Sequence, residues 1–496
     1  MNKQILLGTG GRDRVLSGAK TLYDSVRVTL GPKGRNFIIG KGYSDPVVTH
    51  DGVTVANAVS LKDPAKEVGA AFIRKAARQH DKEVGDGTTT TTILTYKLIE
   101  GYDSLLLNPM QLASSLREEA TKLCDQLKPI DVKDLSKVAT ISSGDAELGK
   151  LIAEAVESVG ESGSVLVEPS QALTTELEYV EGFKIDSGYI SPYMMTDPKT
   201  GRAVYENTTV LVFNSHLNDW SMIKNLLQQK GGSTNMVIIA DDIPRDIIAN
   251  LHTLRKQGAF NCLIIKSPGF GRHRVELLED ICAITGAKLI DNHDQLTPDN
   301  LGKIKRIVTD HESSIITGIT PTKRIKQLKS EMLNAEGLEK ERLNTRIASL
   351  GGKIATIHVG GNSEVEVTEK VYRIDDAVYA SQAAKEEGIL PGGGVAYATL
   401  KTSDTPAGKL FKDALVAPLK QLMENAGLDS TAKLKLIKPG IGFDVLNPDK
   451  PIKLIDNGIV DPAKVVRLAI KTAASIASQV ITMGGLIADE QEKDEN

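Results

Sequence analysis

The stretch Gly85-Asp86-Gly87-Thr88-Thr89-Thr90-Thr91-Thr92 decides how this 496-residue sequence is interpreted. Two glycines flank an acid, and five threonines then open a predicted helix over residues 93–100. A helix N-terminus offers unpaired N–H groups and a positive dipole to a phosphate. A carboxylate such as that of Asp86 can hold a hard cation that bridges phosphate oxygens. The stretch therefore predicts a phosphate site.

An ordinary capped helix, with Asp86 or Thr88 as N-cap, is the alternative interpretation of this stretch. A cap needs one such residue and not six, so phosphate binding is favoured. The site is not a P-loop, because no Gly-Lys-Ser/Thr follows a glycine at the required spacing.

Three further segments carry the same kind of signal but are weak alone. Thr29-Leu30-Gly31-Pro32-Lys33-Gly34-Arg35-Asn36 is a tight turn after a predicted helix, which suits ligand contact or a plain surface turn. Leu390-Pro391-Gly392-Gly393-Gly394-Val395 precedes another helix and permits close backbone approach, or is a flexible turn. Asp375-Asp376-Ala377 is expected to open a helical run, either as caps or as a water-orienting carboxylate.

Composition is ordinary for a globular protein, with 41% hydrophobic and 25% charged residues and a net charge of -4. The length predicts several domains. The charge balance predicts neither a nucleic-acid nor a membrane surface, and no apolar run reaches the ~18 residues of a membrane span. Cys124, Cys262 and Cys282 form no Cys-x-x-Cys pair and are expected to be buried thiols. We expect a cytoplasmic protein without a signal peptide.

The pattern along the chain changes twice. Helices are predicted over residues 12–30 and from 53 to 127, with short strands at 37–39 and 46–49. The middle of the chain alternates between strands and helices, which predicts an α/β domain inserted into a helical one. Its predicted strands are 164–168, 205–213, 235–240 and 261–265, and its predicted helices are 220–229, 245–257 and 323–350. Helices dominate again from residue 375, before an acidic tail at 489–496 that is expected to be disordered.

Taken together with residues 49–52 and Gly458-Ile459-Val460-Asp461-Pro462, these segments resemble, in identity and order, the nucleotide-site motifs of chaperonins. In the middle domain, Tyr189-Ile190-Ser191-Pro192-Tyr193, Ser267-Pro268-Gly269-Phe270-Gly271 and Val180-Glu181-Gly182-Phe183 resemble the group I chaperonins. The resemblance covers nearly the whole chain. The sequence is identified as a divergent, short member of that family.

The resemblance implies a multidomain fold of helical and α/β parts. A helical equatorial ATP domain would comprise residues 1–132 and 388–496, a small intermediate hinge domain residues 133–180 and 361–387, and an inserted α/β apical domain residues 181–360. It implies an ATP-dependent chaperone that encloses non-native client proteins in a sevenfold homo-oligomeric ring, with a lid co-chaperonin. The alternative is a chaperonin-fold binding or scaffold protein with weak or lost ATPase activity.

The resemblance also assigns residues to roles. Asp376 would be the water-orienting base, Asp51 would lie beside the γ-phosphate, and Asp86 would ligate Mg²⁺. K⁺ would lie near the backbone of Thr29 and His50. The nucleotide contacts would be Thr29, Leu30, Gly31, Pro32, His50, Asp86, Gly87, Thr88, Thr89, Thr90, Gly393, Asp444 and Asp461. Clients and the lid would contact Tyr189, Ser191, Tyr193, Met194, Leu227, Ile248 and Leu251.

Several positions depart from the family pattern. His50 stands where a lysine is usual, which removes a fixed cation, since a neutral imidazole is expected near pH 7. Asp444 lies in a segment that replaces the usual Gly-Tyr-Asn-Ala-Ala, so its adenine contact is uncertain. Lys224, His252 and Thr253 fall where apolar client-binding side chains are usual. We therefore expect a narrower client range.

Overall fold

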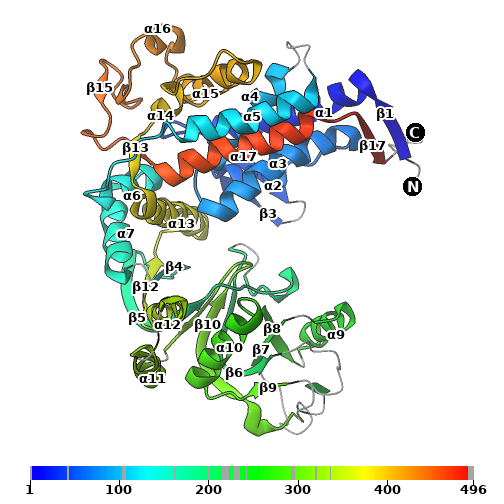
Figure 1. The fold of residues 1–496 in the computed structure, drawn as a ribbon, viewed down its shortest axis with the longest axis vertical. Helices are drawn as coiled ribbons and strands as arrows, with labels where there is room; N and C mark the ends of the chain where they lie inside the picture. Colours follow the sequence, from blue (N-terminus) through cyan, green and yellow to red (C-terminus); the bar gives the residue numbers. More distant parts are fainter. Residues whose placement is uncertain are drawn as a thin grey trace. The chain divides into compact units, whose positions relative to one another are not determined.

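The computed structural model describes residues 3–41, 44–102, 108–160, 163–197, 200–214, 223–224, 226, 235–241, 243–258, 260–291, 296–318, 321–333, 335 and 337–489. The chain divides into two compact units (Figure 1). Unit 1 comprises Met1–Glu154 and Gly361–Asn496, and unit 2 comprises Ala155–Gly360. The predicted fold class, an α/β part inserted into a helical part, is confirmed. The separate intermediate domain stays a prediction.

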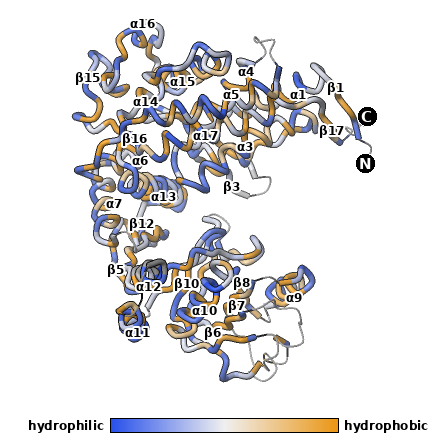
Figure 2. The backbone as a smooth tube through the Cα atoms, viewed as in Figure 1, coloured by the Kyte–Doolittle hydropathy of each residue, from blue (hydrophilic) through white to orange (hydrophobic). Residues whose placement is uncertain are grey.

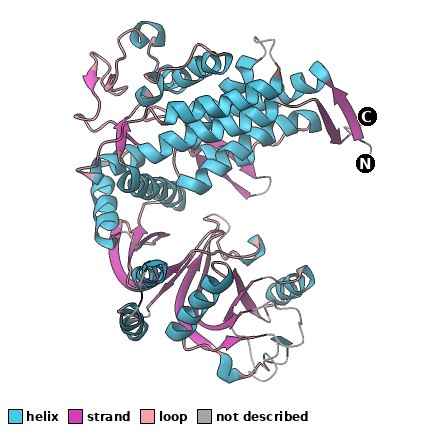
Figure 3. Ribbon diagram, viewed as in Figure 1, coloured by secondary structure: helices cyan, strands magenta, loops and turns pink. Residues whose placement is uncertain are grey.

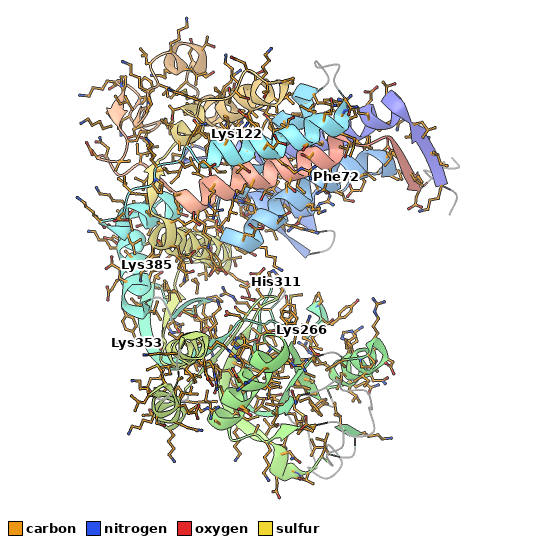
Figure 4. All side chains as sticks on the ribbon, in the orientation of Figure 1. Phe72, Lys122, Lys266, His311, Lys353 and Lys385 are labelled. Atoms are coloured by element: carbon orange, nitrogen blue, oxygen red, sulfur yellow. The ribbon has the colours of Figure 1, made fainter. Side chains whose placement is uncertain are left out.

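Unit 1 is built mainly from helices (Figure 3). Amphipathic sequences place their apolar stripes on a shared core that includes Leu22, Ile73 and Leu116, all fully buried. Phe72, labelled in Figure 4, packs partly buried against that core. The principal helices are α1 (Gly8–Val26), α3 (Pro64–Val84), α4 (Thr88–Gly101), α5 (Pro109–Cys124), α13 (Glu364–Glu387), α15 (Pro406–Asn425) and α17 (Ala463–Ile481).

Helices α1 and α3 pack with their backbones in contact. A Cβ added to Gly18 would lie 1.8 Å from the Lys66 carbonyl oxygen, and one added to Gly69 would lie 1.9 Å from the Val15 carbonyl oxygen. Only glycine fits at these two positions, so the glycines at 18 and 69 allow the two helices to approach this closely.

Short elements complete unit 1. The shorter helices are η1 (Arg27–Thr29), α2 (Gly52–Ala58), α6 (Leu135–Ser143), α14 (Val395–Ala398) and α16 (Ser430–Leu434), and α7 (Ala146–Val159) continues into unit 2. The antiparallel strand pairs are β1 (Lys3–Leu7) with β17 (Gly485–Asp489), β2 (Phe37–Lys41) with β3 (Ser44–Thr49), β13 (Ile389–Pro391) with β16 (Val460–Pro462), and β14 (Ile441–Gly442) with β15 (Ile452–Lys453). The sequence reasoning did not predict that β1 pairs with β17.

Unit 2 contains a nine-stranded mixed sheet in the order β4-β12-β5-β11-β10-β6-β7-β8, with β9 paired to β6. The strands β6, β7 and β8 run parallel, and β7 and β8 are apolar along most of their length (Figure 2), as is typical of a sheet covered on both faces. The strands are β4 (Ser164–Pro169), β5 (Glu176–Ile185), β6 (Ala203–Phe213), β7 (Asn235–Ala240), β8 (Asn261–Lys266), β9 (Leu289–Ile290), β10 (Gly302–Thr309), β11 (Ser314–Thr317) and β12 (Lys353–Val359). The helices are η3 (Pro192–Met194), α9 (Arg245–Lys256), α10 (Gly271–Thr285), η4 (Pro298–Asn300), α11 (Thr322–Met332) and α12 (Gly337–Leu350).

Two predicted helices were wrong in their bounds. The charged stretch 323–350 is two helices, α11 and α12. Asp375 and Asp376 do not open a helix but lie inside α13, which begins at Glu364 because the Ser363 side chain accepts from the Glu366 amide and caps it. Most of the helix predicted at 220–229, with Leu227, lies outside the described residues.

All three cysteines are buried and unpaired, as expected. Burial raises the pKa of the Cys124 thiol to about 11 and that of Cys282 to about 12, so neither is a reactive thiolate. Within the described part of the chain, no helix has the length and apolar character needed to cross a membrane.

Candidate functional site

The turn between α3 and α4 leaves the N-terminus of α4 open. Helix α3 ends at Gly85 with φ +65°, and Gly87 with φ +79° is the N-cap of α4, so no side chain caps its first amides. A Cβ on Gly85 would lie 2.4 Å from the Tyr379 ring, and one on Gly87 would lie 2.5 Å from Val465 Cγ1. The capping alternative, by Asp86 or Thr88, is therefore not what the chain adopts. The amides of α4 remain available to an anion.

The N-terminus of α2 lies beside that of α4. A Cβ on Gly52 would lie 2.3 Å from Thr89 Oγ1, so glycine allows the two helix ends to meet. Asp51 caps α2 by accepting from the Val53 amide at 3.2 Å and the Thr54 amide at 2.8 Å. Thr29 Oγ1 lies 3.2 Å from Thr89 Oγ1. Thr29, Asp51 and Thr89, which are predicted site residues from three separate segments, thus lie in one region of unit 1. We call this region the corner.

The segment after Thr29 turns tightly at Gly31, where φ is +82°. The Gly34 amide donates to the Gly31 carbonyl at 2.8 Å, and the side chain of Asn425 donates to the carbonyls of Arg27 and Leu30, both at 3.0 Å. Gly31 and Pro32 are exposed, and Leu30 is half-buried. This turn is held rigidly while its glycine backbone stays accessible.

The glycine-rich segment at 392–394 adjoins Asp461. Strand β13 pairs Leu390 with Asp461 of β16, and the Gly392 amide donates to the Ile459 carbonyl at 3.0 Å. Gly393 and Gly394 have φ values of +64° and +77°, which favour glycine. The backbone of Gly394 also hydrogen-bonds the Asp461 carboxylate and lowers its pKa in part.

Carboxylates converge on this corner. Burial raises the pKa of Asp86 to about 6, with the negative charge of Asp51 acting in the same direction. Burial, then Asp86, raises the pKa of Asp461 to about 7. Burial, then Asp51 and Asp86, raises the pKa of Asp376 well above its ordinary value. Among the ion pairs of the described residues, none includes these side chains, so the corner brings together carboxylates that have no cationic partner.

That charge fits a hard cation. In the described ranges, no group of three or more His, Cys, Asp or Glu side chains is arranged to hold a metal alone. Mg²⁺ commonly takes only one or two carboxylates and completes its shell with water and phosphate oxygens. The residues present are therefore suited to a magnesium–phosphate ligand, and less suited to a bare structural metal.

We expect Asp461→Asn to raise the melting temperature of the nucleotide-free protein at pH 8 by about 2–4 °C, the shift for about 1 kcal/mol in a large domain. Because the folded-state pKa of Asp461 is raised to about 7, its contribution to stability is present at low pH and is lost as pH rises through about 7. Melting curves of parent and variant from pH 5 to pH 8 check this. A difference in melting temperature that is constant with pH would contradict it.

His50 faces α13. Its Nδ1 lies 3.5 Å from Glu369 Oε1, and the same carboxylate pairs with Arg373 Nη2 at 2.5 Å. Burial, then the positive charge of Arg373, lowers the pKa of His50. The imidazole is therefore neutral near pH 7, and His50 does not supply the fixed positive charge that a lysine would.

Asp444 makes a turn of its own. Its carboxylate accepts from the Leu446 amide at 2.9 Å and from the Asn447 side chain at 3.0 Å. Lys433 lies over the neighbouring Phe443 ring, 4.2 Å from its centroid. The predicted adenine contact by Asp444 stays a prediction.

In unit 2, the predicted client residues differ in exposure. The Tyr189 hydroxyl donates to the Gly201 carbonyl at 3.1 Å, and Ser191 is buried. Tyr193 is 67% exposed and its ring stacks on His252 with centroids 4.5 Å apart. Arg255 fixes this segment by donating to the Tyr193 and Met195 carbonyls, both at 2.7 Å.

Two of the predicted client residues face inward. Met194 and Leu251 are 5% and 2% exposed and belong to the core of unit 2. The apolar stripe of α9, which includes Ile247 and Leu251, packs on the sheet and is not free for a client, while Ile248 is half-buried. Met194 and Leu251 are therefore not exposed in this structure, and their contact with a client stays a prediction.

Sequence reasoning missed two buried residues of the corner. His80 on α3 is 0% exposed, and a Cβ on Gly87 would lie 3.1 Å from its Nε2. Tyr397 is buried, and burial, with Asp461 and Asp86, raises its pKa well above the ordinary value. A signal for His80 existed: it falls on the buried stripe of α3 with Ile73, Ala76, Ala77 and Val84.

Comparison with known proteins concerns the family and the fold of the whole chain. The family model described as the TCP-1/cpn60 chaperonin family matches residues 22–491. Two crystal forms of the chaperonin gp146 from the bacteriophage EL 2 (Pseudomonas aeruginosa), both solved in the presence of ATP-BeFx, have similar folds, with TM-scores of 0.69 and 0.63. Each is 22% identical, and the matches cover 98% of this chain and 99% of theirs. At 22% sequence identity, this structural similarity shows a shared fold and nothing about the activity.

Proposed function

The chain belongs to the TCP-1/cpn60 chaperonin family, and on this premise we propose that it is an ATP-dependent chaperone of the group I type. It binds non-native proteins and encloses them in a ring cavity. The observation that carries the proposal is the corner where the N-termini of α2 and α4 meet the Asp51, Asp86, Asp376 and Asp461 carboxylates, which have no cationic partner among the described ion pairs. A scaffold protein without ATPase activity would have no use for that costly concentration of charge.

In this proposal each residue of the corner has a role. The open amides of α4 and the hydroxyls of Thr88, Thr89 and Thr90 bind phosphates, and Asp86 holds Mg²⁺. Bound ATP would supply the γ-phosphoryl group, and the accompanying Mg²⁺ would supply positive charge beside the Asp86 carboxylate. Asp376 orients a water and accepts its proton as a general base.

The remaining nucleotide and K⁺ contacts are proposed from the similarity to the chaperonin family. Thr29, Leu30, Gly31, Pro32, Gly393 and Asp461 line the nucleotide, and K⁺ lies near the backbone of Thr29 and His50. Nucleotide binding shifts the population of conformers from client binding to enclosure. Sevenfold rings, a lid co-chaperonin and a cytoplasmic location belong to the proposal.

An assay of ATP hydrolysis with and without an unfolded client tests the proposal. Stimulated or altered turnover in the presence of client is the expected result, together with rings in negative-stain images whose shape changes on ATP addition. A protein that forms rings and binds clients but hydrolyses no ATP would favour the scaffold alternative.

We expect His50→Lys to tighten ATP binding by about 1–2 kcal/mol, because a fixed positive charge then lies near the phosphates in a partly desolvated site. His50→Met, which matches the length of lysine without its charge, is the control and should bind ATP like the parent. Titration of ATP between pH 6 and pH 8 measures this. Equal affinities of the parent and the lysine variant throughout would mean that only the His50 backbone matters.

Among the described residues of η3 and α9, Tyr193 is the large apolar side chain that is exposed. The exposed positions of α9 include Arg245, Asp246, Asn250 and Thr253, none of them a large apolar side chain. An exposed aromatic ring is a common anchor for binding. We therefore propose that Tyr193, stacked on His252, is the main apolar anchor in a narrow client range.

Accordingly, Tyr193→Ala is expected to weaken capture of a chemically denatured client by about tenfold, the effect typical of losing an aromatic anchor. Capture by the nucleotide-free protein of several denatured model proteins measures both the anchor and the range. Thr253→Ala on the exposed face of α9 is the control. Unchanged capture by the Tyr193 variant would place the client surface elsewhere.

A further inference from the structure

Helix α15 supports the turn that follows Thr29. The side-chain amide of Asn425, at the end of this helix, donates to the main-chain carbonyls of Arg27 and Leu30, both at 3.0 Å. These two carbonyls flank Thr29 and come directly before Gly31, which is exposed. One side chain from a distant part of the sequence thus holds the backbone on both sides of Thr29.

The orientation of the Asn425 amide is set by its neighbours. Gln421, one helical turn earlier and 5% exposed, donates from Nε2 to Asn425 Oδ1 at 2.8 Å. Gln421 Oε1 accepts from Arg27 Nη1 at 2.9 Å, and Arg27 Nε donates to Asp24 Oδ1 at 2.9 Å. A guanidinium has donors only, so Gln421 must present its oxygen to Arg27 and its NH₂ to Asn425. The Asn425 NH₂ is therefore left to face the carbonyls of the turn.

The same stretch of α15 also contacts both glycine segments of the site. A Cβ added to Gly31 would lie 2.0 Å from Leu422 Cδ1, and one added to Gly393 would lie 3.7 Å from Leu422 Cδ2. A Cβ added to Gly394 would lie 2.8 Å from the Leu419 main-chain nitrogen. Because one helix contacts both segments, α15 sets the spacing between them.

We infer that Asn425 and Gln421 are positioning residues for the nucleotide site. With Arg27 they form a chain of hydrogen bonds that has one possible direction and that holds the turn at 29–32 in place on α15. The inference rests on the proposed function, and it does not place either residue in contact with the nucleotide. A binding turn that is already ordered lowers the cost of binding, so these residues contribute to ATP affinity and not to the chemical step.

Amide hydrogen exchange of the nucleotide-free, full-length protein tests the support of the turn. Asn425→Asp keeps the shape of the side chain, but an ionised carboxylate cannot donate, so both bonds to the turn are lost. Peptides that cover residues 28–36 should exchange about tenfold faster or more in this variant, while α5 stays as protected as in the parent. Lys420→Ala, which truncates a side chain on the same helix that is 54% exposed, is the control and should leave this exchange unchanged.

ATP titration and turnover test the consequence for the site. Asn425→Asp should raise the dissociation constant for ATP about tenfold, while turnover at saturating ATP stays within about twofold of the parent. Arg27→Met should weaken ATP binding by about three- to fivefold, because Gln421 and Asn425 can then reverse their amides. Arg27→Lys, whose ammonium also has donors only, should bind ATP like the parent.

Parental exchange at 28–36 or parental ATP affinity in Asn425→Asp would overturn the inference. So would a loss of turnover at saturating ATP as large as the loss of affinity, because Asn425 would then act on the chemical step or on the whole fold. If Asn425→Asp does not fold, equal ATP affinities of Arg27→Met and Arg27→Lys overturn the inference instead. Failure of the proposed function looks different: a parent that binds ATP without hydrolysing it contradicts that function and leaves the affinity comparison intact, whereas a parent that binds no ATP overturns both.

Discussion

Asp376→Ala is expected to slow ATP hydrolysis by at least about 100-fold while leaving ATP binding nearly intact, because a positioned base contributes about 10²–10⁴ to the rate. Asp376 lies in the interior of α13, whose packing against β3 brings the helix to the segment that leads into Asp51. Burial, and then the negative charges of Asp51 and Asp86, raises the pKa of Asp376. In the proposed function Asp376 acts on water, whereas the proposed phosphate contacts come from other elements.

Single-turnover hydrolysis and ATP titration measure the two effects separately. Asp375→Asn removes a carboxylate from the adjacent position of the same helix and should change the rate only a few-fold. Asp86→Ala should instead lose Mg²⁺-dependent binding. Parental hydrolysis by the Asp376 variant, or a large loss in the Asp375 variant, would show that the base has been assigned wrongly.

Most of the fold was predictable because its signals are local. Strand and helix periodicity marked the α/β insertion, and glycines marked the turns of the corner. The pairing of β1 with β17, which joins Lys3 to Asp489, has no local signal, since register between strands at opposite ends of a chain depends on the folded unit. The start of α13 was misplaced because acids favour helix N-termini, and Asp375 and Asp376 gave that signal in a helix interior.

The sequence was enough to predict which segments form the candidate site, but it was not enough to predict how deeply their side chains are buried. The strings around Thr29, Asp51, Asp86 and Asp461 identified which residues to bring together. What the sequence could not supply was burial: that His80 lies under Gly87, and that Met194 and Leu251 turn into the core. On η3 or α9, neighbouring positions point to different sides, so a shift of one residue decides whether a side chain lies in the core or on the client surface. Amino-acid composition does not show which of the two it is.

The second large effect concerns the stability of unit 2. Asp280 of α10 is buried, and its Oδ1 accepts from Arg324 Nε at 2.7 Å and Arg346 Nη2 at 2.6 Å, while Oδ2 accepts from Arg346 Nε at 2.7 Å. Glu276, one helical turn earlier, accepts twice from Arg342 at 2.7 Å. These bonds tie α10 to α11 and α12, which otherwise have charged, weakly apolar sequences.

Asp280→Ala is therefore expected to destabilise unit 2 by about 3–5 kcal/mol, because Arg346, itself 5% exposed, loses its closest carboxylate and keeps only Glu276, whose Oε2 lies 3.8 Å from Nη1. Hydrogen exchange of α10, α11 and α12 in the full chain measures the loss while unit 1 serves as an internal reference.

The double variant Asp280→Leu with Arg346→Met should recover much of the stability, since an apolar pair of similar volume avoids the desolvation of both charges. Arg342→Ala, whose partner Glu276 keeps other cations nearby, should cost less than Asp280→Ala. If Asp280→Ala exchanges like the parent, the buried carboxylate does not hold these helices, and the apolar contacts of Leu328 and Leu343 with the core must do so instead.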